Sequence, residues 1–203
     1  MIRSPLAVAA ALVLSLPLAS HAIVFQFNAN LTTTAEVHTL VTPSSATGLA
    51  TLFYDDKGTM TAADDTYNFS MSVGNLTGVA SAYHIHGAAT PAQTAGVRVG
   101  LDMPPFGSLN MVGLPLLVGG IGVPVATTYT APPSGPFAGV SFLSMLRGSL
   151  AYVNVHTAGN AAGEVRGQLI EVAQIPEPST YAMLLGGLGI VGFMARRRRA
   201  AQA

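Results

Sequence analysis

The chain has 203 residues and no cysteine, and its nine basic and nine acidic side chains give a formal net charge of zero. Without cysteine the folded part has no disulfide scaffold, so a hydrophobic core must stabilise it. Between the two ends of the chain, residues 23–174 carry four basic and eight acidic side chains, a net charge of −4 (4 − 8). This acidic balance argues against nucleic acid as a partner.

The N-terminal segment, residues 1–22, has the three parts of a secretory signal peptide. Arg3 lies in a short basic region, an apolar region follows from about Pro5 to Leu18, and Ser20 and Ala22 are the small residues before a cleavage site. The alternative is an N-terminal membrane helix, which needs roughly 20 apolar residues, more than this run provides. We therefore predict cleavage after Ala22 and export through the inner membrane.

The segment between the two ends, residues 23–174, has the pattern of one all-β domain. Thr66–Val73 alternates apolar with polar residues, the period-two pattern of a half-buried strand, and no segment shows a sustained 3.6-residue apolar period. Strands are predicted at Ile23–Phe27, Gly48–Tyr54, Thr66–Val73, Val79–His86, Gly96–Asp102, Leu146–His156 and Glu164–Val172. Short strands separated by Gly, Pro, Asp and Ser predict a β-sandwich or barrel.

The segment from Pro104 to Phe137 is rich in proline and glycine and interrupts the regular spacing of the strands. Pro115 and Pro124 each remove a backbone hydrogen-bond donor, so we expect no helix through it. We interpret the segment as a long loop with short strands near Leu116 and Thr128.

Two groups of charged residues are interpreted as structural. The Asp-Asp pairs at 55–56 and 64–65 flank a predicted hairpin turn, and turn formation is favoured over calcium binding because the ligand spacing of calcium loops is absent. Glu164 and Arg166 share a strand face, and an ion pair between them is favoured over a catalytic role.

A pair of histidines in the stretch "YHIHG" is a candidate metal site. His84 and His86 lie two residues apart on a predicted strand, so both imidazoles project from one face of the sheet. Ala80 and Ala82 share that face and leave room beside the rings. The alternative is that both histidines only hydrogen-bond neighbouring loops.

A third histidine, His156, lies near the end of another predicted strand and is a candidate partner for this pair. Neutral imidazoles suit copper, zinc or nickel, and a site for these ions needs three or four ligands. His38 or a carboxylate such as Asp102 is a candidate for the remaining position.

The C-terminal segment, residues 175–203, combines a Pro-Glu-Pro motif, an uncharged apolar stretch from Thr180 to Ala195 and a run of arginines. We predict a transmembrane helix over the apolar stretch, with the arginines as a cytoplasmic stop-transfer cluster. The motif and the cluster are Pro176, Glu177 and Pro178, and Arg196, Arg197, Arg198 and Arg199.

These three parts, in this order, resemble the PEP-CTERM sorting signal. The resemblance implies an exosortase as a partner, a transient anchor in the membrane and removal of the tail. It also implies delivery of the protein to the cell surface or the extracellular matrix.

Two further blocks, "SAYHIHGAATPAQTAGVRVGL" and "LRGSLAYVNVHTAGNAAGEVRGQL", resemble the CHRD (chordin-type) domain. The resemblance covers roughly Phe27 to Glu171 and implies an immunoglobulin-like fold similar to copper-zinc superoxide dismutase. It would place His84 and His86 where two copper ligands lie in the dismutase, with His156 as a candidate third. Dismutase activity is not expected, because the domain has no cysteine and His38 is its one spare histidine.

Together these features predict a non-enzymatic structural or interaction module at the cell surface or in the extracellular matrix. Extracellular polysaccharide and surface proteins are the candidate partners. The alternative is a mononuclear protein that binds copper or zinc through the His-x-His strand. No catalytic residue is predicted.

Overall fold

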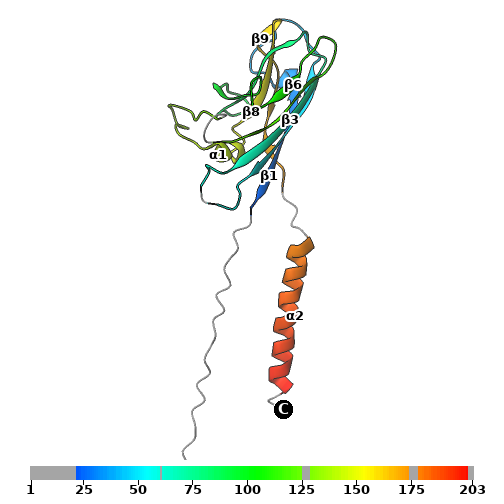
Figure 1. Cartoon of the computed structure of the whole chain (residues 1–203), viewed down its shortest axis with the longest axis vertical. Helices are drawn as coiled ribbons and strands as arrows, with labels where there is room; N and C mark the ends of the chain where they lie inside the picture. The colour runs from blue at the N-terminus through cyan, green and yellow to red at the C-terminus, as the bar shows by residue number, and fades with distance from the viewer. Residues whose placement is uncertain (1–21, 60, 125–128, 174–177, 201–203) are drawn as a thin grey trace, which may run out of the picture.

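The computed structural model describes residues 22–59, 61–124, 129–173 and 178–200. Figure 1 shows a β-domain followed by a separate C-terminal helix. The elements are β1 (Val24–Thr32), η1 (Thr33–Ala35), β2 (Thr47–Asp55), β3 (Thr66–Gly74), β4 (Ala80–His86), β5 (Val97–Gly100), β6 (Gly107–Leu109), β7 (Leu116–Gly122), α1 (Phe142–Arg147), β8 (Tyr152–Thr157), β9 (Asn160–Gln168), β10 (Ile170–Glu171) and α2 (Pro178–Ala200). The prediction of an all-β domain is confirmed.

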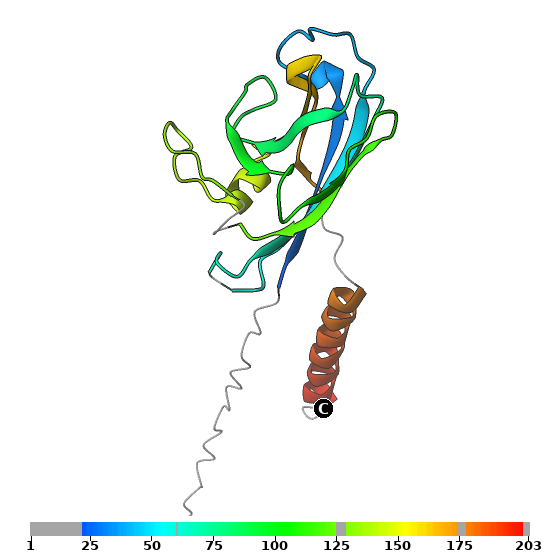
Figure 2. The same ribbon diagram turned by 45° about the horizontal axis from the view of Figure 1, so that its top comes forward.

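The strands of the described chain form one antiparallel sheet that curls into a half-barrel (Figure 2). Their order is β5-β4-β8-β9-β1-β2-β3-β7-β6, and β10 pairs with β1. β1 pairs with β2 along its whole length, but it meets β9 in a single register pair, Thr32 with Arg166. β10 continues the pairing with β1 at Phe27 and Asn28, and the two parts of the sheet joined in this way curl around a common core.

The hydrophobic core consists of alternate residues from both parts of the sheet. Phe27, Leu52 and Phe69 are fully buried in the part formed by β1, β2 and β3, and Ile85 and Val153 are fully buried in β4 and β8. The burial of β3 alternates residue by residue, so the period-two pattern predicted a half-buried strand correctly.

A six-residue helix, α1, replaces the first part of one predicted strand. The strand predicted at Leu146–His156 begins only at Tyr152, as β8, so its first six residues were assigned wrongly. Ser141 caps the helix, since its hydroxyl accepts a hydrogen bond from the amide of Ser144 at 3.2 Å. Six residues make fewer than two turns, which is too short for an apolar period to be visible in the sequence.

The proline- and glycine-rich segment contains β6 and β7, and it is not helical in its described residues, 104–124 and 129–137. The strand expected near Leu116 is confirmed as β7, which pairs with β3. The strand expected near Thr128 lies outside the described residues.

The aspartates beside the hairpin between β2 and β3 accept hydrogen bonds from backbone amides and from a tyrosine of β2. Asp56 Oδ1 accepts hydrogen bonds from the amides of Ile23 at 2.7 Å and Gly58 at 2.9 Å. Asp65 accepts one from the Tyr54 hydroxyl at 2.6 Å. These contacts agree with the structural interpretation of the two Asp-Asp pairs.

α2 covers the whole apolar stretch, Thr180–Ala195, for which a transmembrane helix was predicted. In the described part of the chain, however, no helix is both long and apolar enough to cross a membrane. The uncharged stretch from Thr180 to Ala195 spans about 24 Å as a helix, against a hydrocarbon core of about 30 Å, and Arg196–Arg199 occupy the turns that follow it.

Parts of both predicted targeting segments lie outside the described residues. These parts are residues 1–21 of the signal peptide, and Pro176 and Glu177 of the sorting motif. Pro178 is the first residue of α2.

Candidate metal site

The three histidines predicted as metal ligands lie together on neighbouring antiparallel strands. β4 carries His84 and His86, and β8 carries His156, which lies opposite the small residue Ala82 in the register of the two strands. One ring nitrogen from each histidine lies within 4.8 Å of the other two. The ring centroids are 5.5 to 5.8 Å apart.

The histidine cluster occupies the face of the sheet that points away from the hydrophobic core. Ile85 and Val155 are fully buried in the core, so the histidines next to them project from the opposite face. This second face is also covered, because His86 is only 8% exposed. The polar side chains of this second face therefore form a covered layer that is separate from the hydrophobic core.

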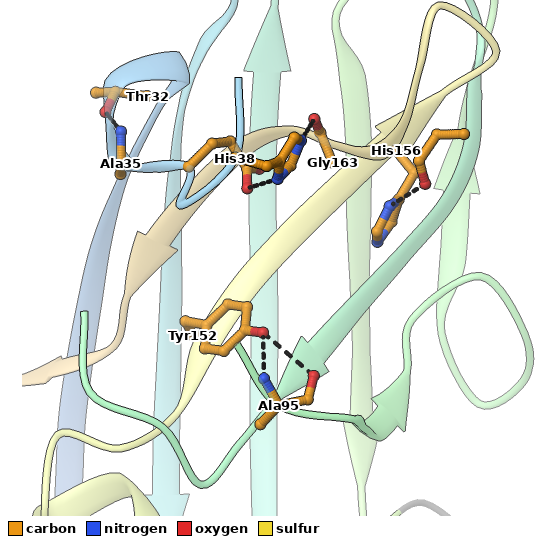
Figure 3. A network of polar contacts seen from close by, with 9 residues as sticks. Thr32, Ala35, His38, Ala95, Tyr152, His156 and Gly163 are labelled. Atoms are coloured by element: carbon orange, nitrogen blue, oxygen red, sulfur yellow. Dashed lines mark hydrogen bonds and ion pairs between the residues drawn. The ribbon is translucent and has the colours of Figure 1, made fainter. Parts of the chain in front are cut away.

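In each histidine one ring nitrogen faces an acceptor. His86 Nδ1 donates to the carbonyl of Ala95 at 2.9 Å. His156 Nδ1 donates to the carbonyl of Ala161 at 3.0 Å (Figure 3). His84 Nε2 lies 3.5 Å from a carboxylate oxygen of Asp102. Because a carbonyl oxygen can only accept, both Nδ1 atoms carry a hydrogen, and the neutral rings keep a lone pair on Nε2.

The remaining ring nitrogens are those available to an ion. Nδ1 of His84, Nε2 of His86 and Nε2 of His156 are buried and have no hydrogen-bond partner among the described residues. A histidine that ligates a metal usually donates its other N–H to a carbonyl or a carboxylate, which fixes the ring and its tautomer. His86 and His156 have this arrangement, and the carboxylate of Asp102 lies 3.5 Å from the corresponding nitrogen of His84.

The surroundings of the cluster keep the three rings neutral. Burial lowers the pKa of His86 to about 4, and the neighbouring histidines also disfavour its charged form. Burial likewise lowers the pKa of His84 and of His156, although Asp102 opposes the effect at both residues. Since a metal binds the neutral imidazole, no proton has to be displaced at neutral pH.

Tyr152 supports the cluster, and the sequence did not identify it as a site residue. Its ring stacks on His86 with centroids 5.1 Å apart and planes 10° apart. Its hydroxyl accepts from the Ala95 amide at 3.0 Å and donates to the Ala95 carbonyl at 3.2 Å (Figure 3). The carbonyl that orients His86 is therefore itself fixed by Tyr152. The available signal was its position on β8, which places it on the face of His156.

The two candidates for a further ligand have other contacts. His38 Nε2 donates to the Gly163 carbonyl at 3.1 Å, and its Nδ1 lies 3.5 Å from Glu36 (Figure 3). It is not a member of the cluster that the described residues form. Asp102 lies 3.5 Å from Nε2 of His84, the nitrogen opposite the unpaired Nδ1, where it orients the ring.

The ion pair predicted between Glu164 and Arg166 is wrong, because each side chain has other partners in the described chain. Glu164 is fully buried and accepts hydrogen bonds from the hydroxyls of Ser44 at 2.6 Å, Thr77 at 2.6 Å and Thr157 at 2.5 Å. Burial raises its pKa, but these hydrogen bonds outweigh burial and leave the pKa below its ordinary value.

Arg166 is 2% exposed and places its guanidinium carbon 3.5 Å from the centroid of the Tyr152 ring. Its Nη2 donates to the Thr90 carbonyl at 3.2 Å. A cation over an aromatic face is stabilised by the electrons of the ring. Tyr152 therefore contacts both a histidine of the cluster and this buried cation.

Family models match two parts of this chain. The CHRD domain matches residues 27–169, and the PEP-CTERM protein-sorting motif matches residues 174–199. No curated protein and no solved structure matches the chain. The sorting motif implies export of the protein and its sorting to the cell surface by an exosortase. The CHRD match includes every histidine of the cluster and more than half of the chain, so this protein belongs to the CHRD-domain family and carries a C-terminal PEP-CTERM sorting motif.

Proposed function

We propose that this protein is a cell-surface module whose CHRD domain binds one copper or zinc ion through His84, His86 and His156. One observation carries the proposal: a ring nitrogen from each of the three histidines lies within 4.8 Å of the other two. Each ring also has a buried nitrogen with no hydrogen-bond partner among the described residues, while its opposite nitrogen faces an acceptor. If the histidines served only to hydrogen-bond neighbouring loops, nothing would require the three rings to gather or to leave a buried nitrogen unpaired on each.

Copper is the ion that this donor set favours. Divalent copper binds nitrogen ligands more tightly than zinc, and neutral imidazole suits both ions. Three protein ligands also leave room for water or another small ligand on the ion. The side chain of His84 is 18% exposed, so the cluster is reached from solvent on that side.

Metal analysis tests the proposal directly. We expect protein purified from cells to retain about one copper or zinc ion per chain after dialysis, measured by mass spectrometry of the metals. His84→Ala and His86→Ala should each lower the affinity for copper by more than the roughly 10- to 100-fold effect typical of residues that only support a ligand. The matched control is His38→Ala, which removes a histidine of the same domain outside the cluster and should leave the affinity unchanged.

Two results would contradict the metal site. One is a purified protein that retains no metal and gains no thermal stability from added copper or zinc. The other is equal loss of binding in His38→Ala and His84→Ala, since this would indicate adventitious coordination. Circular dichroism of each variant without metal establishes that it is folded.

We further propose that the domain binds partners and does not act as an enzyme, with extracellular polysaccharide or surface proteins as the partners. His38 supports this role over a dismutase with two metals, because its ring nitrogens face Gly163 and Glu36. Copper-loaded protein should dismutate superoxide no faster than the His84→Ala variant treated in the same way. A high activity that is lost in His84→Ala would establish an enzyme instead.

A further inference from the structure

The outer face of the sheet is covered over one part and open over the other. Over β4, β8 and β9 the outward side chains include buried ones, such as His86, Asn154 and Arg166. Over β1, β2, β3 and β7 the buried core residues alternate with residues that are exposed or half-buried. This second part of the outer face is therefore accessible to a partner.

The strand registers align these outward residues in three rows across the sheet. The middle row, from β1 to β6, is Asn28, Thr51, Ser70, Gly119 and Gly107. The other two rows lie two residues away along each strand, and one of them also reaches β6. We call these fourteen residues the open face, and they are the alternate residues of 26–30, 49–53, 68–72, 117–121 and 107–109.

The open face carries no charged side chain, although the domain around it has four basic and eight acidic ones. Asp55, at the end of β2, lies one outward position beyond the rows. An anionic polymer would find no cation on the open face, and a cationic polymer would find no anion within the three rows. Charge complementarity therefore favours an uncharged partner.

The open face also divides into strips that follow the strands. β3 contributes a strip of small polar side chains, Asn68, Ser70 and Ser72. Large apolar side chains flank this strip on both sides, and each is between 42% and 64% exposed. They are Leu49 and Phe53 of β2 and Leu117 and Ile121 of β7. Hydroxyl and amide groups are thus accessible between two apolar strips.

A neutral polysaccharide has the chemistry that matches these strips. A sugar ring presents hydroxyl groups at its edge and carbon-bound hydrogens on its faces. Its hydroxyls both donate and accept, as do the amide of Asn68 and the hydroxyls of Ser70 and Ser72. Outward positions recur about every 7 Å along a strand, so a linear chain of sugars lying along β3 can contact several of them at once.

The size of the open face argues against a folded protein, including a second copy of this chain, as the partner. One outward residue takes up roughly 33 Å² of a sheet, so the fourteen residues cover roughly 450 Å². A stable protein–protein interface needs about 800 Å² from each partner. A long polysaccharide tolerates weak individual sites, because several copies of the domain at one surface can bind the same chain.

We propose that the open face binds a neutral, linear polysaccharide that lies along β3 and packs against Phe53. The proposal rests on the surface role proposed above, where it gives the partner its charge and its binding face. It does not involve the metal site, because the histidine cluster lies on β4 and β8, under the covered part of the outer face.

Affinity electrophoresis of the full-length protein in native gels tests the proposal. The neutral probes are mixed-linkage β-glucan, glucomannan, galactomannan and dextran, and the anionic probes are alginate and polygalacturonate. We expect at least one neutral polysaccharide to retard the protein, and both anionic ones to retard it less. Retardation by none of the neutral probes, or stronger retardation by an anionic one, would overturn the proposal.

Matched variants show whether the open face is the site. Ser70→Arg places a long charged side chain in the middle of the polar strip and should weaken binding at least about tenfold, and Phe53→Ala should weaken it about tenfold. The control is Ala92→Arg, which adds the same charge at an exposed position beside Arg166 and should change binding less than about twofold. Circular dichroism of each variant establishes that it is folded.

The failure of this inference is distinguishable from the failure of the function proposed above. If the wild type binds a neutral polysaccharide and folded Ser70→Arg binds it equally well, the open face is refuted while the surface role stands. If His84→Ala loses this binding and Ser70→Arg does not, the polysaccharide is assigned to the metal site and the inference is overturned. Ser70→Arg should retain the metal content of the wild type.

Sedimentation velocity tests the alternative occupant, a second copy of the chain. We expect the wild type and Ser70→Arg to sediment as the same species. A wild-type dimer that Ser70→Arg dissociates would assign the open face to a second copy and overturn the proposal.

Discussion

Tyr152 holds His86 from two directions, through its ring and through the Ala95 backbone. Tyr152→Phe keeps the stacked ring but removes both hydrogen bonds to Ala95, so the carbonyl that orients His86 becomes less fixed. We expect the affinity for copper to fall by about 10- to 100-fold, the range for residues that support a ligand. Competition with a chelator of known affinity measures this loss.

The control for Tyr152→Phe is Tyr83→Phe. Tyr83 lies on β4 but donates to the Ser108 hydroxyl at 2.7 Å, and it takes no part in the cluster. This variant should bind copper as the wild type does. If both variants bound copper as tightly as the wild type, Tyr152 would have no positioning role.

Glu36 makes stability depend on pH in a direction that is unusual for a carboxylate. Burial raises its pKa from 4.5 in the unfolded chain to about 7 in the folded one. Between these values the unfolded state releases a proton that the folded state keeps, so stability falls as pH rises from about 4.5 to about 7. We expect Glu36→Gln to be more stable than the wild type at pH 8, by at most about 3 kcal/mol, and equally stable at pH 4.

Urea unfolding at pH 4 and pH 8 measures this difference. The chain has no tryptophan, so circular dichroism is the suitable signal. Glu171→Gln is the control, because Glu171 contacts Arg147 at the surface, and its effect should be within about 0.5 kcal/mol at both pH values. A Glu36→Gln variant less stable than the wild type at pH 8 would contradict the raised pKa of Glu36.

Among individual residues, the sequence predicted the histidine pair but not the residues that position it. A spacing of two residues places His84 and His86 on one face of any strand. His156 was a candidate because it lies near the end of another predicted strand, and the family resemblance agreed with it. The contact between Tyr152 and Ala95 joins residues 57 positions apart. Such a contact depends on how a loop crosses the sheet, which local patterns do not encode. Whether the three rings bind an ion stays a prediction.

Among the elements, β9 contains a glycine whose environment no other residue fits. Gly163 has φ of +138°, and a Cβ there would lie 2.6 Å from Glu36 Oε1 and 2.7 Å from the Asn154 amide atoms. Gly163→Ala should therefore lower the free energy of unfolding by about 2–4 kcal/mol, through backbone strain and displacement of buried polar groups. Urea unfolding at neutral pH measures this change.

Gly74, the last residue of β3, is the matched control for Gly163. A Cβ at this position meets no atom within 4 Å. Gly74→Ala should leave stability unchanged or raise it by up to about 1 kcal/mol, because alanine restricts the unfolded chain. Equal effects of the two substitutions would mean that the close packing around Gly163 is not the cause of the stability change in Gly163→Ala.

Element prediction succeeded where one face of a strand is apolar and the other is exposed, as in β3. It failed at α1, where six residues give no period, and where β8 begins. β8 is buried on both faces at Tyr152–Val155, so its pattern does not alternate and gives no clear starting point. The prediction of an ion pair between Glu164 and Arg166 failed for a related reason. Both residues are buried, and each contacts other partners instead.

For the whole molecule, the sequence predicted an all-β domain but left open whether it was a sandwich or a barrel. The answer depends on the junction of β1 and β9, a single register pair between segments more than a hundred residues apart. The described core ends at Leu169, and α2 contributes no residue to it. The domain and the sorting tail are therefore built as separate parts, each with its own role.

This separation predicts that sorting depends on the tail and not on the metal site. Replacing Pro176, Glu177 and Pro178 with alanine in the full-length protein removes the motif read by the exosortase. We expect the variant to stay uncleaved in the inner-membrane fraction, while the wild type reaches the surface or matrix fraction in a shorter form. Immunoblots of both fractions measure this.

The control for the sorting variant is the double variant His84→Ala/His86→Ala, which changes the domain but leaves the tail intact. It should be processed and delivered as the wild type is, because none of the described core comes from α2 and the substituted side chains lie on the covered polar face of the sheet. Retention of the wild type at the inner membrane would contradict the prediction that the tail directs sorting. Mislocalisation of a folded double variant would show instead that the domain takes part in its own delivery.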